Sequence, residues 1–142
     1  MTESPKLIEK FLLLCPEFRA KWDEHVAYWG DQERGEYTDI AEFAHFLVDS
    51  YAHQRTESFP RIFSEIERLL TEGDPNVKEL VSVGLLEDIQ TIASHHEFGS
   101  EAFTRWLEPT SRQVWYEIAK MWEGKSSLSD VIREEQQRRN DV

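Results

Sequence analysis

Hydrophobic positions recur three and four residues apart along most of the chain, which is the spacing of one face of an α-helix. In "DIAEFAHFLVDSYAHQ" (39–54), one such stripe consists of Ile40, Phe43, Ala44, Leu47, Val48 and Tyr51. A second, in "FPRIFSEIERLLTEG" (59–73), consists of Ile62, Phe63, Ile66, Leu69 and Leu70. No stretch alternates apolar and polar residues as a half-buried strand does, and no two-residue hairpin turn occurs. The pattern predicts an all-α protein.

Capping residues, prolines and glycines divide this pattern into about seven to eight helices. Ser4 and Pro5 start the first helix, and Pro16 starts a second that ends at Gly30. Thr38 or Asp39 is expected to cap the third. Further helices are expected over about 59–73, 75–95, 100–107 and 109–123, with Gly124 as the last stop. We therefore expect a single compact multi-helix bundle over 1–142, in which about 125–142, capped by Ser127, forms a peripheral helix that frays at its end.

The stretch "VSVGLLEDIQ" (81–90) combines a glycine, an apolar run and two adjacent carboxylates. Because the helix over 75–95 is apolar on most of its circumference, it is expected to be central. Gly84 is then expected where a neighbouring helix approaches too closely for a Cβ, at a cost of about 1 kcal/mol in helix propensity relative to alanine. Glu87 and Asp88 point about 100° apart, so they cannot act as a cooperating pair. At least one is expected at the core boundary, where it would need an Arg or Lys, or backbone and side-chain donors. Arg61, Arg68 and Arg105 are the plausible partners.

Composition favours a packed globule without a membrane span. The chain has 142 residues, of which 39% are hydrophobic and 12% aromatic. Its one cysteine, Cys15, excludes an intramolecular disulfide and is expected to be buried rather than nucleophilic. No apolar run approaches the roughly 20 residues that cross a bilayer, and the N-terminus does not resemble a signal peptide. A cytoplasmic location is expected.

The charge of the chain indicates the kind of partner. Sixteen Lys and Arg stand against 28 Asp and Glu, which gives a net charge of −12. Residues 37–74 carry 3 basic and 8 acidic side chains, whereas 109–142 carry 6 of each. This excess of negative charge disfavours nucleic acid and anionic membrane and favours a basic protein partner. The simpler alternative is that the acidity only keeps the protein soluble.

One face of the 39–54 helix carries Glu42, His45, Phe46, Asp49 and His53. His45, Asp49 and His53 are spaced four residues apart, as metal ligands on one helix face can be, but no HExxH or paired Glu-x-x-His motif accompanies them. The alternative is a partner-binding patch, with Phe46 as an aromatic anchor inside a polar rim. Phe46 could equally be covered by another helix of the domain. The candidate partner-binding residues are Glu42, Phe46, Asp49, Glu57, Glu65 and Glu72.

Motifs of catalysis are absent from the sequence. It has no glycine-rich phosphate loop, no nucleophile elbow and no Ser-His-Asp ordering. The two histidines of "SHHEF" (94–98) suit a helix C-terminus, where the helix dipole favours them. The sequence therefore predicts neither an enzyme nor a cofactor or metal site.

Two runs resemble a family of small helical bacterial proteins of unassigned function. They are "FPRIFSEIERLLTEGDPNVKELVSVGLLEDIQ" and "WLEPTSRQVWYEIAKMWEG", which together span about Phe59 to Gly124. The family looks like the immunity proteins of bacterial toxin systems, which are small, acidic, cytosolic proteins that each bind and block one cognate toxin. The matched residues are mainly core and turn positions, and the Phe46 face lies outside them.

The resemblance and the charge together lead to a functional hypothesis. We expect a stoichiometric, immunity-type inhibitor that neutralises a basic bacterial toxin, with a nuclease as one candidate class. Charge complementarity would speed the encounter. The alternatives are a homo-oligomeric scaffold or adaptor whose exposed aromatics mediate self-association, and a metal-dependent enzyme that uses His45, Asp49 and His53. The oligomeric state is not predicted.

Overall fold

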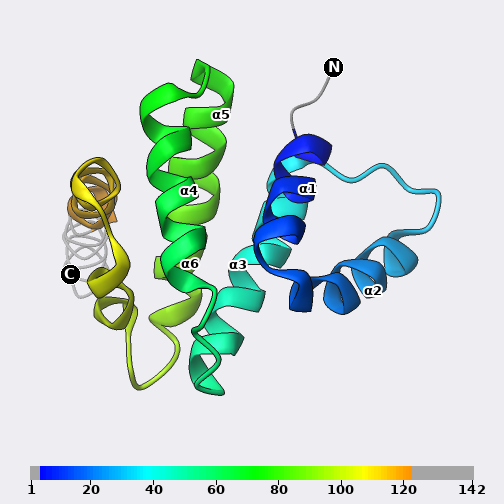
Figure 1. Ribbon diagram of the computed structural model, residues 1–142, viewed down its shortest axis with the longest axis horizontal. Coiled ribbons are helices and arrows are strands. Elements are labelled where there is room, and N and C mark those ends of the chain that lie inside the picture. The colour runs from blue at the N-terminus through cyan, green and yellow to red at the C-terminus, as the bar shows by residue number, and fades with distance from the viewer. Residues whose placement is uncertain (1–3, 123–142) are drawn as a thin grey trace, which may run out of the picture.

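The computed structural model describes residues 4–122, and every regular element in this range is helical (Figure 1). The elements are α1 (Ser4–Leu14), the 3₁₀ turn η1 (Pro16–Phe18), α2 (Arg19–Trp29), α3 (Glu36–Ala52), α4 (Phe59–Glu72), α5 (Pro75–Glu79), the π-helical η2 (Leu80–Leu86), α6 (Glu87–Ala93) and the 3₁₀ helix η3 (Ser100–Trp106). A further helix covers 109–122. The predicted all-α bundle is confirmed. The expected stop at Gly124 and the helix at about 125–142 lie outside the described residues.

Two long helices form the centre of the fold. One is α3, and the other is the continuous helix α5–η2–α6, which packs against α3 along η2 and α6. Figure 1 shows α1 and α2 on one side of α3, with α4, α5 and α6 on the other. The predicted core stripes are confirmed except at Tyr51, which is only partly buried. Ile40, Phe43, Ala44, Leu47 and Val48 of α3 are buried, as are Ile62, Phe63, Ile66, Leu69 and Leu70 of α4.

Aromatic side chains fill the core between these helices. Phe11 of α1 stacks on Phe43 of α3, with ring centroids 4.4 Å apart, and Phe18 meets the same ring at 4.9 Å. Cys15 is also buried, as expected, and burial followed by the nearby Glu17 raises the pKa of its thiol to about 12. This thiol is therefore held protonated and unreactive at neutral pH.

Gly84 lies where the central helix packs closely against α3, as the sequence predicts. A Cβ at this position would lie 3.0 Å from Cγ2 of Ile40 and 3.3 Å from Cδ1 of Tyr37, both on α3. The helix is not covered on every side, however, because Val83 is 49% exposed. The wider π-helical turn was not predicted. Such turns insert an extra residue into a helix and displace the side chains that follow.

Asp88 follows this π-helical segment and is partly buried. The predicted pairing of this carboxylate with Arg61, Arg68 or Arg105 is wrong. Arg68 instead forms an ion pair with Glu65, Arg61 donates to Ser58, and the guanidinium of Arg105 lies over the ring of Trp106. Burial raises the pKa of Asp88 to about 6, and the charge of Glu87 adds to the increase.

A carboxylate of α4 holds the start of the 109–122 helix. The backbone N–H groups of Thr110 and Ser111 donate to Glu67 at 2.9 and 2.8 Å. Partial burial raises the pKa of Glu67, but these hydrogen bonds outweigh that effect and leave the pKa below its usual value. The ionised carboxylate thus satisfies two N–H groups that have no partner within the helix. Among residues 4–122, no helix is both long enough and apolar enough to cross a membrane.

The contact at Gly84 predicts the result of filling it. Gly84→Leu should lower the free energy of unfolding by about 1–3 kcal/mol, because the added side chain must displace buried Ile40. The exposed Val83→Leu is the matched control and should change stability by less than about 0.5 kcal/mol. Urea denaturation measures both. A Gly84→Leu protein as stable as the parent would contradict the close approach.

The raised pKa of Asp88 predicts a pH-dependent contribution to stability. The folded pKa lies near 6, above the ordinary value of 3.8, so this contribution is fully present below pH 3.8 and is lost as the pH rises through 6. At pH 7, Asp88→Asn should therefore stabilise the protein by about 1 kcal/mol, a figure reduced for solvent screening at this partly exposed group. Denaturation at pH 4.5 and pH 7.5 measures the difference. Equal effects of the substitution at the two pH values would contradict it.

Candidate functional site

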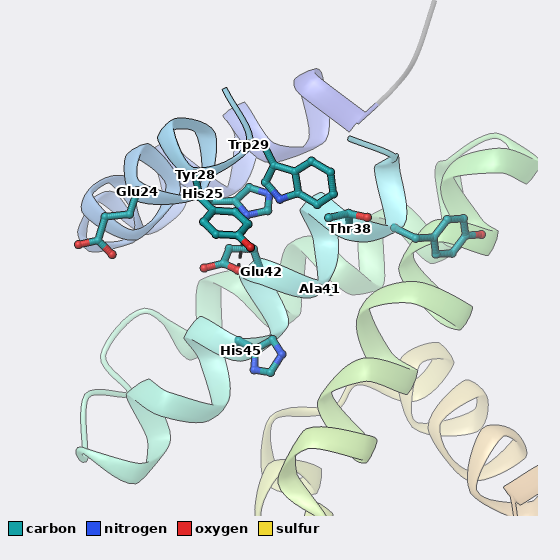
Figure 2. Close-up of a pocket in the computed structure, with 9 residues that line it drawn as sticks. Glu24, His25, Tyr28, Trp29, Thr38, Ala41, Glu42 and His45 are labelled. Carbon is teal, nitrogen blue, oxygen red and sulfur yellow. Dashed lines mark ion pairs between the residues drawn. The ribbon is translucent and has the colours of Figure 1, made fainter. Parts of the chain in front are cut away.

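An open hollow of about 620 Å³ lies between α2 and α3 (Figure 2). Residues of α2 form one wall: Glu24, His25, Tyr28 and Trp29. Residues of α3 form the floor and the other wall: Tyr37, Thr38, Ala41, Glu42 and His45. Figure 2 shows Tyr28, Trp29 and Glu42 facing the same space, whereas Glu24 lies apart at the rim. We call this surface the α2–α3 hollow.

A buried imidazole joins the two walls of the hollow. His25 of α2 is 8% exposed, and its Nε2 lies 3.0 Å from Oδ1 of Asp39. Its Nδ1 lies 3.6 Å from Oε2 of Glu42, so both ring nitrogens face carboxylates of α3. Because the ring is buried and Asp39 holds its Nε2, the arrangement indicates a structural link between helices rather than a general base.

Asp39 is the centre of this link. The sequence suggested Thr38 or Asp39 as a helix cap, but α3 begins earlier, at Glu36, with Gly35 as its N-cap. Asp39 therefore lies inside the helix and is 6% exposed. A buried carboxylate needs donors. Besides His25, Arg34 of the α2–α3 loop supplies one, with its Nε donating to Oδ1 at 2.8 Å.

Aromatic rings surround the charged link. The guanidinium of Arg34 lies 5.2 Å from the ring centroid of Trp22, in cation–π geometry. The ring of His25 lies between those of Trp22 and Trp29, at centroid distances of 5.4 and 6.4 Å. Tyr28 is 86% exposed and Tyr37 45% exposed at the edge of the hollow. Large exposed rings beside carboxylates are typical of binding surfaces.

The structure separates the residues proposed from the sequence as partner contacts. Glu42 lines the hollow, and Asp49 is exposed further along α3. Phe46 is only partly buried, but its ring packs on Phe18 and Phe43 at 5.1 and 6.3 Å, so most of it belongs to the core.

The proposed contacts beyond α3 have different surroundings. Glu65 of α4 is 8% exposed and pairs with Arg68 at 2.7 Å, which argues against direct contact with a partner. Glu57 and Glu72 are exposed. None of these three lines the hollow, which is formed by α2 and α3.

His45, Asp49 and His53 do not converge. Within residues 4–122, no group of three or more His, Cys, Asp or Glu side chains is placed to hold a metal ion. His53 instead directs Nδ1 to the backbone oxygen of Asp49 at 2.9 Å. Since His45 lines the hollow, it is grouped with Glu42 rather than with His53.

The α2 side of the site was not predicted from the sequence. Trp22, His25 and Trp29 are spaced three and four residues apart, which places them on one helix face. A histidine between two tryptophans on a helix with few other apolar residues was the signal that could have identified this face. Its partner Asp39 could not be recognised while it was interpreted as a cap.

Comparisons with known proteins identify the family of the chain. No curated protein and no solved structure matches it. A family model described as "Domain of unknown function (DUF7674)" matches residues 8–123, a longer stretch than the two runs noted in the sequence and one that includes both walls of the hollow. That description names no activity. With most of its length matched, the chain belongs to this family of domains of unknown function.

Proposed function

We propose that this protein is a stoichiometric, immunity-type inhibitor that binds and neutralises a basic bacterial toxin in the cytoplasm. The observation that carries the proposal is the α2–α3 hollow, an open surface with exposed aromatic rings and carboxylates on a chain of net charge −12. Such a surface suits a positively charged protein, since charge complementarity guides the encounter and desolvated aromatic anchors hold the complex.

Solvent-accessible carboxylates of α3 supply the negative charge for this interaction. Glu42 lies in the hollow with its side chain 25% exposed, and Asp49, with its side chain 60% exposed, lies beyond it on the same helix. His45 lies between them in the sequence and is also exposed. The proposed docking surface therefore extends from the hollow along α3, with Phe46 as a partly buried support rather than a free anchor.

Blocking the partner requires no chemistry from this chain. The cluster of His25, Asp39 and Arg34 is buried or partly buried and internally paired, so it fixes the shape of the surface. A rigid, preformed surface loses little conformational entropy on binding, which favours a tight one-to-one complex.

Charge reversal tests this proposal against the protein encoded beside this chain, because an immunity gene normally directly follows its toxin gene. The double variant Glu42→Lys and Asp49→Lys should slow association about tenfold or more at low salt and weaken its dependence on salt. Stopped-flow fluorescence at several salt concentrations measures the rate.

The matched control, Glu101→Lys and Glu117→Lys, reverses two exposed carboxylates outside the hollow. It should leave intact the part of the association rate that depends on the docking surface. Circular dichroism establishes that both variants are folded. If the Glu42 and Asp49 variant associates as fast as the control, the docking surface is wrong. If the parent protein does not bind the neighbouring toxin, the proposed function is wrong.

Self-association is the second candidate, and one observation favours it. Tyr116, Met121 and Trp122 of the 109–122 helix are 45%, 60% and 44% exposed. Light scattering of the parent protein over a dilution series separates the two functions. A monomer at all concentrations would remove the scaffold hypothesis, whereas a dimer that forms in the toxin's absence would support it.

A further inference from the structure

The ionisable side chains that line the α2–α3 hollow favour negative charge. They are the carboxylates of Glu24 and Glu42 and the imidazoles of His25 and His45, with no lysine or arginine among them. The surrounding segment 19–45 carries seven acidic and three basic residues. One of those three, Arg34, is already bound to Asp39. A cation entering the hollow would therefore meet an attractive potential.

The fold already holds one guanidinium group beside the hollow. Arg34 places its guanidinium over the ring of Trp22 at 5.2 Å while its Nε donates to Asp39 at 2.8 Å. This is a complete recognition unit for arginine, because the planar cation stacks on an aromatic face and donates to a carboxylate at its edge.

The hollow repeats the components of that unit without an internal arginine. Trp29 and Tyr28 supply the rings, and Glu42 supplies a carboxylate that faces the same space (Figure 2). Tyr28 is 86% exposed, so its ring is accessible to a ligand. The volume of about 620 Å³ is ample for one long side chain.

We infer that the α2–α3 hollow receives an arginine side chain of the basic partner, with its guanidinium stacked on the exposed Tyr28 ring, paired with Glu42 and bordered by the Trp29 ring, which stands at 78° to that of Tyr28. This deepens the proposed function and rests on it in taking the partner to be a basic protein. Arginine suits the site better than lysine, because an ammonium is more strongly hydrated and cannot stack as a plane.

A titration with small peptides tests the inference without the toxin. The probe is N-acetyl-Gly-Arg-Gly-amide, and its matched controls carry citrulline or lysine in place of arginine. Citrulline keeps the shape of the side chain but removes its charge. With ¹⁵N-labelled protein, the arginine peptide should shift the Trp29 indole resonance and the backbone resonances of Tyr28 and Ala41, with millimolar affinity. The citrulline peptide should not, and the lysine peptide should bind at least about threefold more weakly.

Substitutions then assign the contacts. Tyr28→Ala and Glu42→Gln should each weaken arginine-peptide binding by about threefold or more, since each removes one half of the recognition unit. Tyr116→Ala and Glu101→Gln are the controls, because both residues are exposed outside the hollow, and neither should change the affinity. Because Tyr28 is exposed, Tyr28→Ala should fold as the parent does. It therefore keeps the test valid if Glu42→Gln perturbs the nearby His25.

The outcomes separate this inference from the proposed function. Three results would overturn the arginine assignment. They are equal shifts with the citrulline peptide, equally tight binding of the lysine peptide, or no shift at these residues at about 20 mM peptide, a concentration well above the range expected for such a small contact. Toxin binding could still be intact in each of those cases. Conversely, arginine-specific shifts in the hollow together with a toxin that does not bind would support the site and refute the immunity role.

Discussion

The buried contact between His25 and Asp39 is the constraint on which the candidate site depends. It joins α2 to α3 through a nitrogen-to-oxygen distance of 3.0 Å, and the same carboxylate oxygen accepts from Arg34 in the connecting loop. A carboxylate this well buried is tolerated only with such donors. The contact thereby fixes the position of α2, and the space left beside it is the hollow.

The rest of the fold provides a firm base for this arrangement. The central helix α5–η2–α6 packs closely on α3 at Gly84, where Ile40 and Tyr37 occupy the space of a side chain. Asp39 and Ile40 are consecutive, so one turn of α3 contacts α2 through Asp39 and the central helix through Ile40. Tyr37 both borders Gly84 and lines the hollow. The core and the site are therefore coupled through the first turns of α3.

The sequence predicts the core better than it predicts the site, for a physical reason. Apolar residues repeat with the helix period because burial acts on every turn, so the stripes of α3 and α4 and the role of Gly84 follow from spacing alone. Polar contacts between helices have no such period. The bond from His25 to Asp39 spans 14 positions, and the ion pair that removes Glu65 from the predicted surface depends on how α4 is oriented. The surroundings of Asp88 show the same limit, because residue type alone did not indicate that Arg61, Arg68 and Arg105 make other contacts.

A double-mutant cycle on His25 and Asp39 tests the central claim most directly. The stabilities of His25→Ala, Asp39→Ala and the double variant, measured by urea denaturation, give the coupling energy of the pair. We expect a favourable coupling of about 1–3 kcal/mol, because His25→Ala removes one donor of the buried Asp39 carboxylate and Asp39→Ala removes the acceptor of the buried His25 Nε2. The exposed pair of Asp49 and His53, whose side chains are 60% and 61% exposed, is the control and should couple far more weakly. Additive effects at His25 and Asp39 would contradict the claim that this contact positions α2 and forms the hollow.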